Sequence, residues 1–181
     1  FESWDAFFLV FEGELNVNAV TFAEEEETQI KEIEGPWQVS FGENESEFSS
    51  LTSWSENPEP AIKYFSGTAS YQTNFNFETK ESGSNYELDL GSVKYLAEVI
   101  LNGENLGIVW KTPFKINITS ALKEGENQLE IRVVNTWVNR LIGDAQAGAE
   151  KTTFTTMPFY QANSPLLESG LLGPVKILKI D

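Results

Sequence analysis

The chain has 181 residues, of which 40% are hydrophobic and 13% aromatic, a composition typical of a folded globular domain, and no apolar run is long enough to span a membrane. The formal net charge of −16 makes nucleic acid an unexpected partner, because a polyanion would be repelled. Histidine and cysteine are absent, which excludes catalysis by Ser-His-Asp or Cys-His groups, metal sites built from imidazole or thiolate, and disulfides, whereas a structural calcium ion held by oxygen atoms remains open.

Residues 1–34 predict a part of the chain that differs from the main domain. The apolar run AFFLVF (6–11) is typical of a strand buried on both faces, and ELNVNAVTF (14–22) alternates like a strand with one buried face. In the acidic stretch that follows (23–34), the run Glu24–Glu27 favours a solvated linker over a cation site, because adjacent like charges repel. We therefore expect the end of a preceding β region plus an acidic linker, or strands folded back on the main domain. The chain starts without an initiator methionine or a basic segment, as expected of a piece of a longer protein.

Residues 35–181 predict one all-β domain, because apolar and polar residues alternate along most of this region. The expected strands are GPWQVSF (35–41), SGTASYQTNFNF (66–77), YELDL (86–90), AEVIL (97–101), FKINI (114–118), QLEIRVV (128–134) and a closing SGLLGPVKILKI (169–180). Asn102-Gly103 predicts a tight hairpin, since both residues tolerate a positive φ, and SALK (120–123) predicts one helical turn. Short strands with many turns indicate an antiparallel β-sandwich or barrel.

Large side chains on one face of the long strand 66–77 predict the core of this domain. Tyr71, Phe75 and Phe77 lie on that face, and Thr, Asn and Gln occupy the other. Trp37 and Trp54 are also expected to pack in the core or at its edge.

The stretch VNTWVNRLIGD (134–144) stands where a strand should end in a simple turn. In one interpretation Trp137 closes the end of the sandwich, Arg140 pairs with Asp144, and the Asn side chains satisfy backbone groups where the sheet stops. In the other, Trp137 supports a pyranose ring, and Asn139, Arg140 and Asp144 hydrogen-bond its hydroxyls. The residues alone leave both interpretations open.

A long irregular stretch from Gly143 to Ser169 follows, and loops of this length are usually functional or packed against a partner. Exposure of Phe159 and Tyr160 would make this loop a surface that faces a partner or a ligand. Trp110, at the end of another strand, either stacks on a sugar or packs beneath the loop. Tyr160 and Trp110 complete the set of candidate ligand-binding residues.

Paired carboxylates are the signature of glycosidases, but no acidic residue of this chain lies in an apolar stretch that would raise its pKa for acid catalysis. Asp89 and Asp144 are interpreted as turn or ion-pair residues. The sequence therefore predicts no catalytic residue.

Several motifs in a fixed order carry a family resemblance: GPWQVSF, YFSGTASYQTNF, the region from LDLGSVKYLAEVILNGENLG to VNTWVNRLIGD, and ESGLLGPVKI. Together they resemble the sugar-binding β-sandwich, a galactose-binding-like jelly roll, of family 2 glycoside hydrolases. They are more similar still to the version at the C-terminus of bacterial family 106 α-L-rhamnosidase-like enzymes. The resemblance covers residues 35–181, and the opening SWDAFFLVF resembles the strand that closes the preceding domain in those proteins.

The resemblance implies a jelly-roll fold and an accessory, carbohydrate-binding-type role beside a catalytic barrel domain of the same polypeptide, which would hold both catalytic carboxylates. It also implies a periplasmic or extracellular protein. A purely structural interdomain module without sugar affinity is the alternative, and a third class is a glycosidase in its own right.

Overall fold

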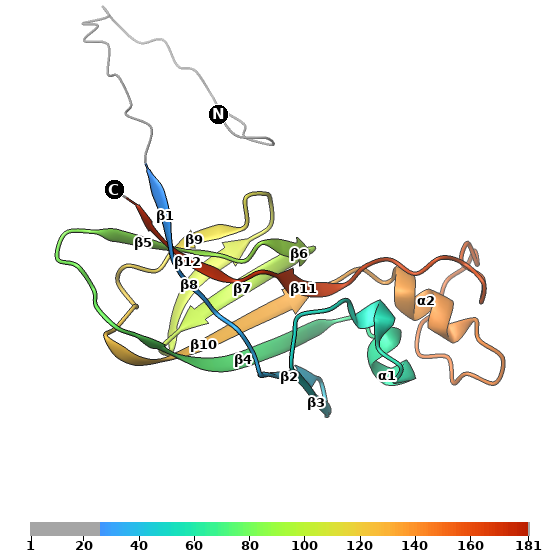
Figure 1. Cartoon of the computed structure of the whole chain (residues 1–181). Coiled ribbons are helices and arrows are strands. Elements are labelled where there is room, and N and C mark those ends of the chain that lie inside the picture. The colour runs from blue at the N-terminus through green and yellow to red at the C-terminus, as the bar shows by residue number, and fades with distance from the viewer. Residues whose placement is uncertain (1–25, 181) are drawn as a thin grey trace, which may run out of the picture.

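A computed structural model describes residues 26–180 of the chain, which form a β-sandwich of two main antiparallel sheets (Figure 1). The strands of the six-stranded sheet lie in the order β3 (Asn44–Phe48), β2 (Trp37–Phe41), β4 (Thr68–Phe77), β10 (Gly125–Val134), β7 (Leu96–Leu101) and β8 (Glu104–Val109). The four-stranded sheet has the order β1 (Glu27–Glu32), β12 (Lys176–Ile180), β5 (Asn85–Asp89) and β9 (Lys115–Asn117). A third, small sheet pairs β11 (Gly170–Gly173) with β6 (Ser92–Lys94), and the helices are a 3-10 turn η1 (Trp54–Glu56), α1 (Pro60–Lys63) and α2 (Val138–Asp144). This architecture confirms the expected galactose-binding-like β-sandwich.

The alternating pattern located most of the strands correctly. The hairpin at Asn102-Gly103 joins β7 to β8, and both residues have positive φ, 54° and 83°. In the SALK region, Leu122 donates its N–H to the Ile118 carbonyl over 2.9 Å, a single turn that does not continue as a helix. The closing apolar stretch is not one strand but two, because Pro174 has no N–H to donate and separates β11 from β12.

The core lies between the two main sheets. Tyr71, Phe75 and Phe77 of β4 are all buried, as their shared face predicted, and Trp37 and Trp54 are almost completely enclosed. The indole N–H of Trp54 donates to the Tyr71 hydroxyl, which also accepts the Leu171 N–H at 3.2 Å. Burial is the main cause that raises the pKa of Tyr71 to about 12, against the opposing effect of these two hydrogen bonds.

The acidic stretch before residue 35 is not all linker, because Glu27–Glu32 form β1. This strand pairs with β12 from Glu27 opposite Ile180 to Glu32 opposite Lys176. Residues Glu27–Glu32, expected to belong to a linker, are therefore part of the four-stranded sheet. β1 is an edge strand, so its charged side chains keep their water. The strands expected at 6–11 and 14–22 lie outside the described residues.

Helix α2 and the chain that follows it lie at one end of the sandwich, opposite the end that carries β1 and the last residues of β12 (Figure 1). None of the helices within residues 26–180 has the length and apolar character needed to cross a membrane. Most of the candidate site residues belong to the α2 end.

Candidate functional site

Helix α2 begins shortly after β10, which pairs with β4 and β7 up to its last residue, Val134. Asn135, the first residue after β10, uses its side chain in place of backbone partners: its Oδ1 accepts the Gly67 N–H at 3.1 Å, and its Nδ2 donates to the Phe65 carbonyl at 2.9 Å. These two bonds satisfy backbone groups where the sheet ends, and after Trp137 the chain enters the seven residues of α2. The strand pattern predicted only a strand end here, whereas the structure has a helix.

Asn139 of α2 holds the end of the long loop. Its Nδ2 donates to the Leu167 carbonyl at 2.7 Å and to the Ser169 hydroxyl at 3.0 Å, and its Oδ1 accepts the Leu167 N–H at 2.8 Å. The side chain is buried and its hydrogen-bonding capacity is used within the protein. This geometry is that of the structural interpretation, in which Asn side chains satisfy backbone groups.

Asp144, the last residue of α2, holds the start of the same loop. It accepts the N–H and the hydroxyl of Thr153 at 2.8 and 2.5 Å, and the N–H of Thr152 at 3.2 Å. Arg140, one turn earlier on α2, places Nη2 2.7 Å from the other carboxylate oxygen. Burial acts to raise the pKa of Asp144, but the hydrogen bonds from Thr153 and Thr152 and the charge of Arg140 outweigh it and lower the pKa. A general acid needs a raised pKa, which is the opposite shift.

Arg140 of α2 borders a cavity that residues of α1 also line. Its Nε is buried and has no hydrogen-bond partner, while its guanidinium borders an open cavity of about 380 Å³ that Tyr64, Gln146 and Glu150 also line. Tyr64 packs closely against α2 at Gly143. Only a glycine allows this approach, because a Cβ at position 143 would lie 2.6 Å from the Cβ of Tyr64.

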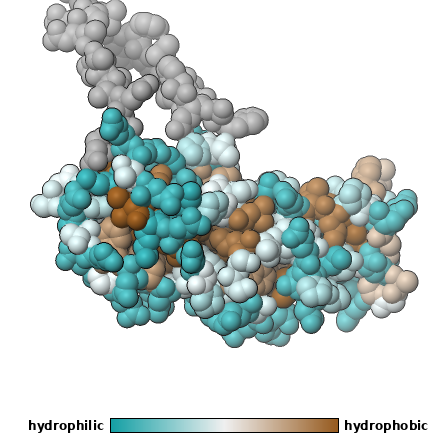
Figure 2. Space-filling model, in the orientation of Figure 1, coloured by the Kyte–Doolittle hydropathy of each residue, from teal (hydrophilic) through white to brown (hydrophobic). Residues whose placement is uncertain are grey.

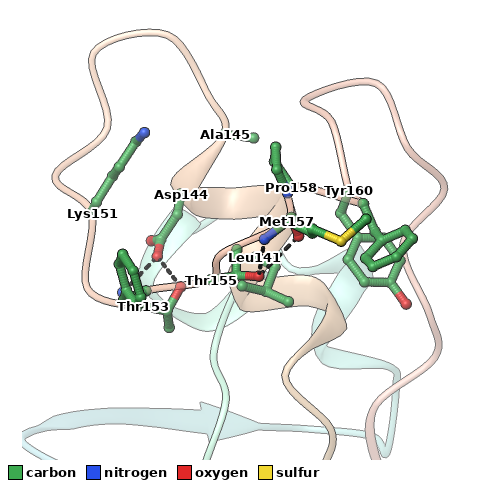
Figure 3. Close-up of a pocket in the computed structure, with 11 residues that line it drawn as sticks. Leu141, Asp144, Ala145, Lys151, Thr153, Thr155, Met157, Pro158 and Tyr160 are labelled. Carbon is green, nitrogen blue, oxygen red and sulfur yellow. Dashed lines mark hydrogen bonds between the residues drawn. The ribbon is translucent and has the colours of Figure 1, made fainter.

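A second cavity, of about 360 Å³, opens between α2 and the loop (Figure 3). Its walls are mostly apolar, and its polar lining residues include Asp144, Thr153 and Lys151. The lining residues are Leu141, Asp144, Ala145, Lys151, Thr153, Phe154, Thr155, Met157, Pro158, Phe159 and Tyr160. Of the sequence-predicted residues, Asp144 and Tyr160 thus share one cavity, and Arg140 borders the other.

The loop between Lys151 and Tyr160 carries large apolar side chains on its surface. Phe154 and Phe159 are 85% and 77% exposed, and Met157 is exposed as well. Figure 2 shows hydrophobic atoms at the surface over the α2 end of the molecule. Phe159 and Tyr160 were predicted candidates, but Phe154 and Met157 were not, although three large apolar residues within six positions of a polar loop are a usable signal.

Trp110 and Trp137 line neither cavity. Trp137 is the residue before α2, and Trp110 follows β8 at the edge of the six-stranded sheet; both are largely exposed. Trp137 therefore does not close the sandwich as a buried plug, and Trp110 does not pack beneath the loop. A ligand-binding role for the six candidate residues stays a prediction.

Within residues 26–180, no group of three or more acidic side chains is arranged to hold a metal ion, and a bound calcium ion stays a prediction. Asp89 is the last residue of β5, and its side chain accepts the Gly91 N–H at 2.8 Å where the strand ends.

Comparison with known proteins places this geometry in a family. Residues 53–163 match the family model described as glycosyl hydrolase 2 galactose-binding domain-like. A rhamnosidase from Novosphingobium sp. PP1Y superposes with a TM-score of 0.85 at 43% identity, over 91% of this chain and 16% of that one. A protein of Formosa agariphila, whose name proposes beta-glucuronidase activity, is 42% identical in an alignment 176 residues long that covers 80% of this chain and 15% of the relative. A beta-D-glucuronidase of Dictyoglomus thermophilum shares the fold, with a TM-score of 0.60 at 20% identity over 88% of this chain and 29% of that one.

The chain thus spans about 15% of the length of the curated relative that it matches. The family model covers more than half of the chain, from the residue before η1 to the end of the exposed loop. The chain therefore belongs to the glycosyl hydrolase 2 galactose-binding domain-like family.

Proposed function

We propose that this chain is a non-catalytic accessory domain of a longer glycoside hydrolase of the α-L-rhamnosidase type, and that it braces the catalytic part of that polypeptide. The similarity to a rhamnosidase extends over nearly the whole chain but over a small part of the rhamnosidase, which supports a domain within a larger enzyme. The sequence points the same way, since no acidic residue lies in an apolar stretch that would raise its pKa for acid catalysis.

The observation that carries the bracing role is the exposed apolar loop 151–160. Phe154, Met157 and Phe159 have no polar atom that gains from contact with water, and exposed apolar patches commonly mark interaction sites. Two hydrogen bonds hold the loop in one shape: Thr153 donates to Asp144 of α2, and Gln146, two residues after α2, donates to the carbonyl of Ala162, just beyond the loop, at 2.9 Å. A surface that is already ordered loses little entropy on docking, which favours a stable contact with a neighbouring domain.

The test compares the 181-residue chain with the longer polypeptide that the proposal implies. The double substitution Phe154→Ser and Phe159→Ser should leave the melting temperature of the isolated chain unchanged, because both rings are exposed. In the longer polypeptide it should lower the melting temperature and let a protease release this domain. Ile30→Ser, on the exposed face of β1 at the opposite end, is the matched control and should change neither. A longer polypeptide that resists heat and protease equally well with and without the two rings would contradict the bracing role.

A second candidate function is contact with a glycan, and exposed aromatic residues at the same end favour it. Trp110, Trp137 and Tyr160 are all accessible to a ligand in the chain as described. Titration of tryptophan fluorescence with rhamnose, galactose and a pectin-derived oligosaccharide tests it; absence of a saturable change would favour a purely structural interdomain module. A periplasmic or extracellular location belongs to the same proposal and is tested by cell fractionation.

A further inference from the structure

Two cavities adjoin helix α2, and different residues of the helix line each of them. Leu141 and Ala145, one turn apart, line the cavity that opens toward the loop 151–160 (Figure 3), whereas Arg140 lines the cavity toward α1. The cavity toward the loop has a volume of about 360 Å³ and mostly apolar walls. An apolar cavity of about 150 Å³ is large enough to bind benzene, so this one admits the ring of a large side chain.

The exposed apolar side chains of the loop form the rim of this cavity. Phe154, Met157 and Phe159 line it, and each of them is also at least 60% exposed to solvent. The apolar surface at the α2 end is therefore concave at this point. A small ligand that filled the cavity would leave most of the rim in water, whereas a protein surface around an inserted side chain would cover it. A filled pocket surrounded by contacts that exclude water is typical of the residues that dominate protein interfaces.

Lys151 gives this cavity an unpaired positive charge. It lines the cavity, and among residues 26–180 its ammonium has no ion-pair or hydrogen-bond partner. Asp144, the acidic residue of the same lining, is paired with Arg140 at 2.7 Å. Glu150, the neighbour of Lys151 in the chain, lines the cavity toward α1 instead. The charge that remains at the cavity beside the loop is therefore positive, and an acidic partner would complement it.

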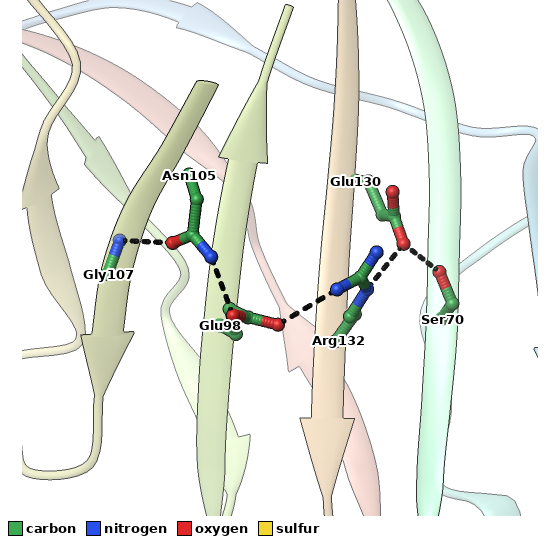
Figure 4. A network of polar contacts seen from close by, with 6 residues as sticks. All are labelled: Ser70, Glu98, Asn105, Gly107, Glu130 and Arg132. Atoms are coloured by element: carbon green, nitrogen blue, oxygen red, sulfur yellow. Dashed lines mark hydrogen bonds and ion pairs between the residues drawn. The ribbon is translucent and has the colours of Figure 1, made fainter. Parts of the chain in front are cut away.

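The charged network on the outer face of the six-stranded sheet differs in this respect, because its members are paired with one another (Figure 4). Arg132 lies 2.7 Å from Glu130 and 3.2 Å from Glu98, and Asn105 donates to Glu98 at 2.7 Å. A partner that approached this network would compete with bonds that already exist. The cavity beside Lys151 offers both an apolar space and an unpaired charge, and is therefore the better docking site.

We propose that the cavity between α2 and the loop 151–160 receives one large apolar side chain from the rest of the same polypeptide, and that a carboxylate beside that side chain pairs with Lys151. The rest of the polypeptide is the expected occupant because the similar rhamnosidase is far longer, and this chain corresponds to 16% of it. The inference rests on the bracing role and adds the chemistry of the contact. This chain supplies the cavity and the cation, and its neighbour supplies the inserted side chain and the acid.

The experiment measures how fast a protease releases this domain from the longer polypeptide, a rate that follows the population of the undocked form. Ala145→Trp fills the cavity from the side of α2 and should speed release about tenfold, the change that a loss of about 1.4 kcal/mol gives. Ala147→Trp adds the same ring at an exposed position that lines neither cavity, and should leave the rate unchanged.

The isolated 181-residue chain shows whether either substitution disturbs the fold. Ala145 directly follows α2 and is exposed, so Ala145→Trp and Ala147→Trp should both leave the melting temperature of the isolated chain unchanged. Ala145→Leu, a smaller insertion into the same cavity, replaces Ala145→Trp in the release assay if the larger ring lowers that temperature.

The charge is tested in the same release assay. Lys151→Glu should speed release more than Lys151→Met, which keeps an apolar side chain and removes only the charge. The effect of Lys151→Glu should shrink at high salt, because salt screens exposed charges. Lys123→Glu, at an exposed lysine outside the cavity, is the matched control and should leave the rate unchanged. Release that is equally fast with Lys151→Glu and in the natural polypeptide would overturn the pairing with a carboxylate.

The release rates also separate this proposal from the bracing role. If the double substitution Phe154→Ser and Phe159→Ser speeds release but Ala145→Trp does not, the interface covers the loop without entering the cavity; the inserted side chain is then wrong and the bracing role stands. If neither change speeds release, both proposals fail. Faster release with Ala145→Trp and with Lys151→Glu, but with neither control, supports the inserted side chain and its acid.

Discussion

Asp144 at the end of α2 accepts both the backbone N–H and the hydroxyl of Thr153, nine residues later, at 2.8 and 2.5 Å. This pair of bonds closes the start of the exposed loop onto the helix. Arg140 completes the arrangement by neutralising the carboxylate over 2.7 Å. The loop therefore has a defined shape even though nearly all of its side chains face solvent.

Replacement of Asp144 should loosen the loop and lower stability. Asp144→Asn keeps the size of the side chain but removes its charge, and hydrogen bonds to charged groups contribute about 1.5–3 kcal/mol. We expect a loss of ~2 kcal/mol in the free energy of unfolding measured with urea, and faster hydrogen exchange at the Thr152 and Thr153 amides. Glu150→Gln, which neutralises an exposed acid nearby, should change neither. Unchanged exchange at Thr153 in the Asp144 variant would mean that other contacts hold the loop.

The same carboxylate should make stability depend on acid pH. The pKa of Asp144 is lowered in the folded state, because the hydrogen bonds from Thr153 and Thr152 and the charge of Arg140 outweigh the effect of burial. The unfolded chain binds its proton at about pH 4, so the contribution of Asp144 is complete above that pH and is lost as the pH falls through the lower, folded pKa. The measurement is the difference in unfolding free energy between the natural chain and Asp144→Asn over a pH series. A difference that stays constant into acid would contradict this assignment.

Gly143 should not tolerate a side chain. A Cβ there would lie 2.6 Å from the Cβ of Tyr64 and 2.8 Å from Nη2 of Arg140. Gly143→Ala should lower the free energy of unfolding by about 1–3 kcal/mol, as overpacking does, although alanine favours a helix. Tyr64→Gly removes the Tyr64 Cβ, so Gly143→Ala should lower the free energy of unfolding by less in the Tyr64→Gly background. Equal costs in both backgrounds would show that α1 and α2 are not packed as described.

Tyr71 should resist titration and stabilise the core. Tyr71→Phe removes the acceptor for the Trp54 indole and the Leu171 N–H, and should lower stability by about 1–3 kcal/mol, whereas Tyr160→Phe on the surface should have no effect. Burial first of all raises the pKa of Tyr71 to about 12. Because the folded pKa lies above the ordinary value of 10.0, the stability from the neutral phenol is present below that value and is lost as the pH rises through about 12. Ultraviolet titration of the folded chain should show a late ionisation that is missing in Tyr71→Phe; a titration curve that this substitution leaves unchanged would refute the assignment.

The sequence alone determined the features that depend on near neighbours. Period-two alternation located β4, β5, β7 and β10, because residues two apart in a strand share a face whatever the strand pairs with. The hairpin at Asn102-Gly103 followed from the φ preferences of two residues. The absence of histidine and cysteine excluded whole classes of chemistry without any structure.

Tertiary structure alone decided what the candidate site residues contact. Asn139 bonds to residues 28 and 30 positions away, and β1 pairs with a strand at the other end of the chain. No local pattern encodes such partners, so the same polar residues were equally compatible with a sugar site and with a structural closure. Short-range preferences act within a few residues, whereas the contacts that assign roles to side chains form between segments that only the packed sandwich brings together.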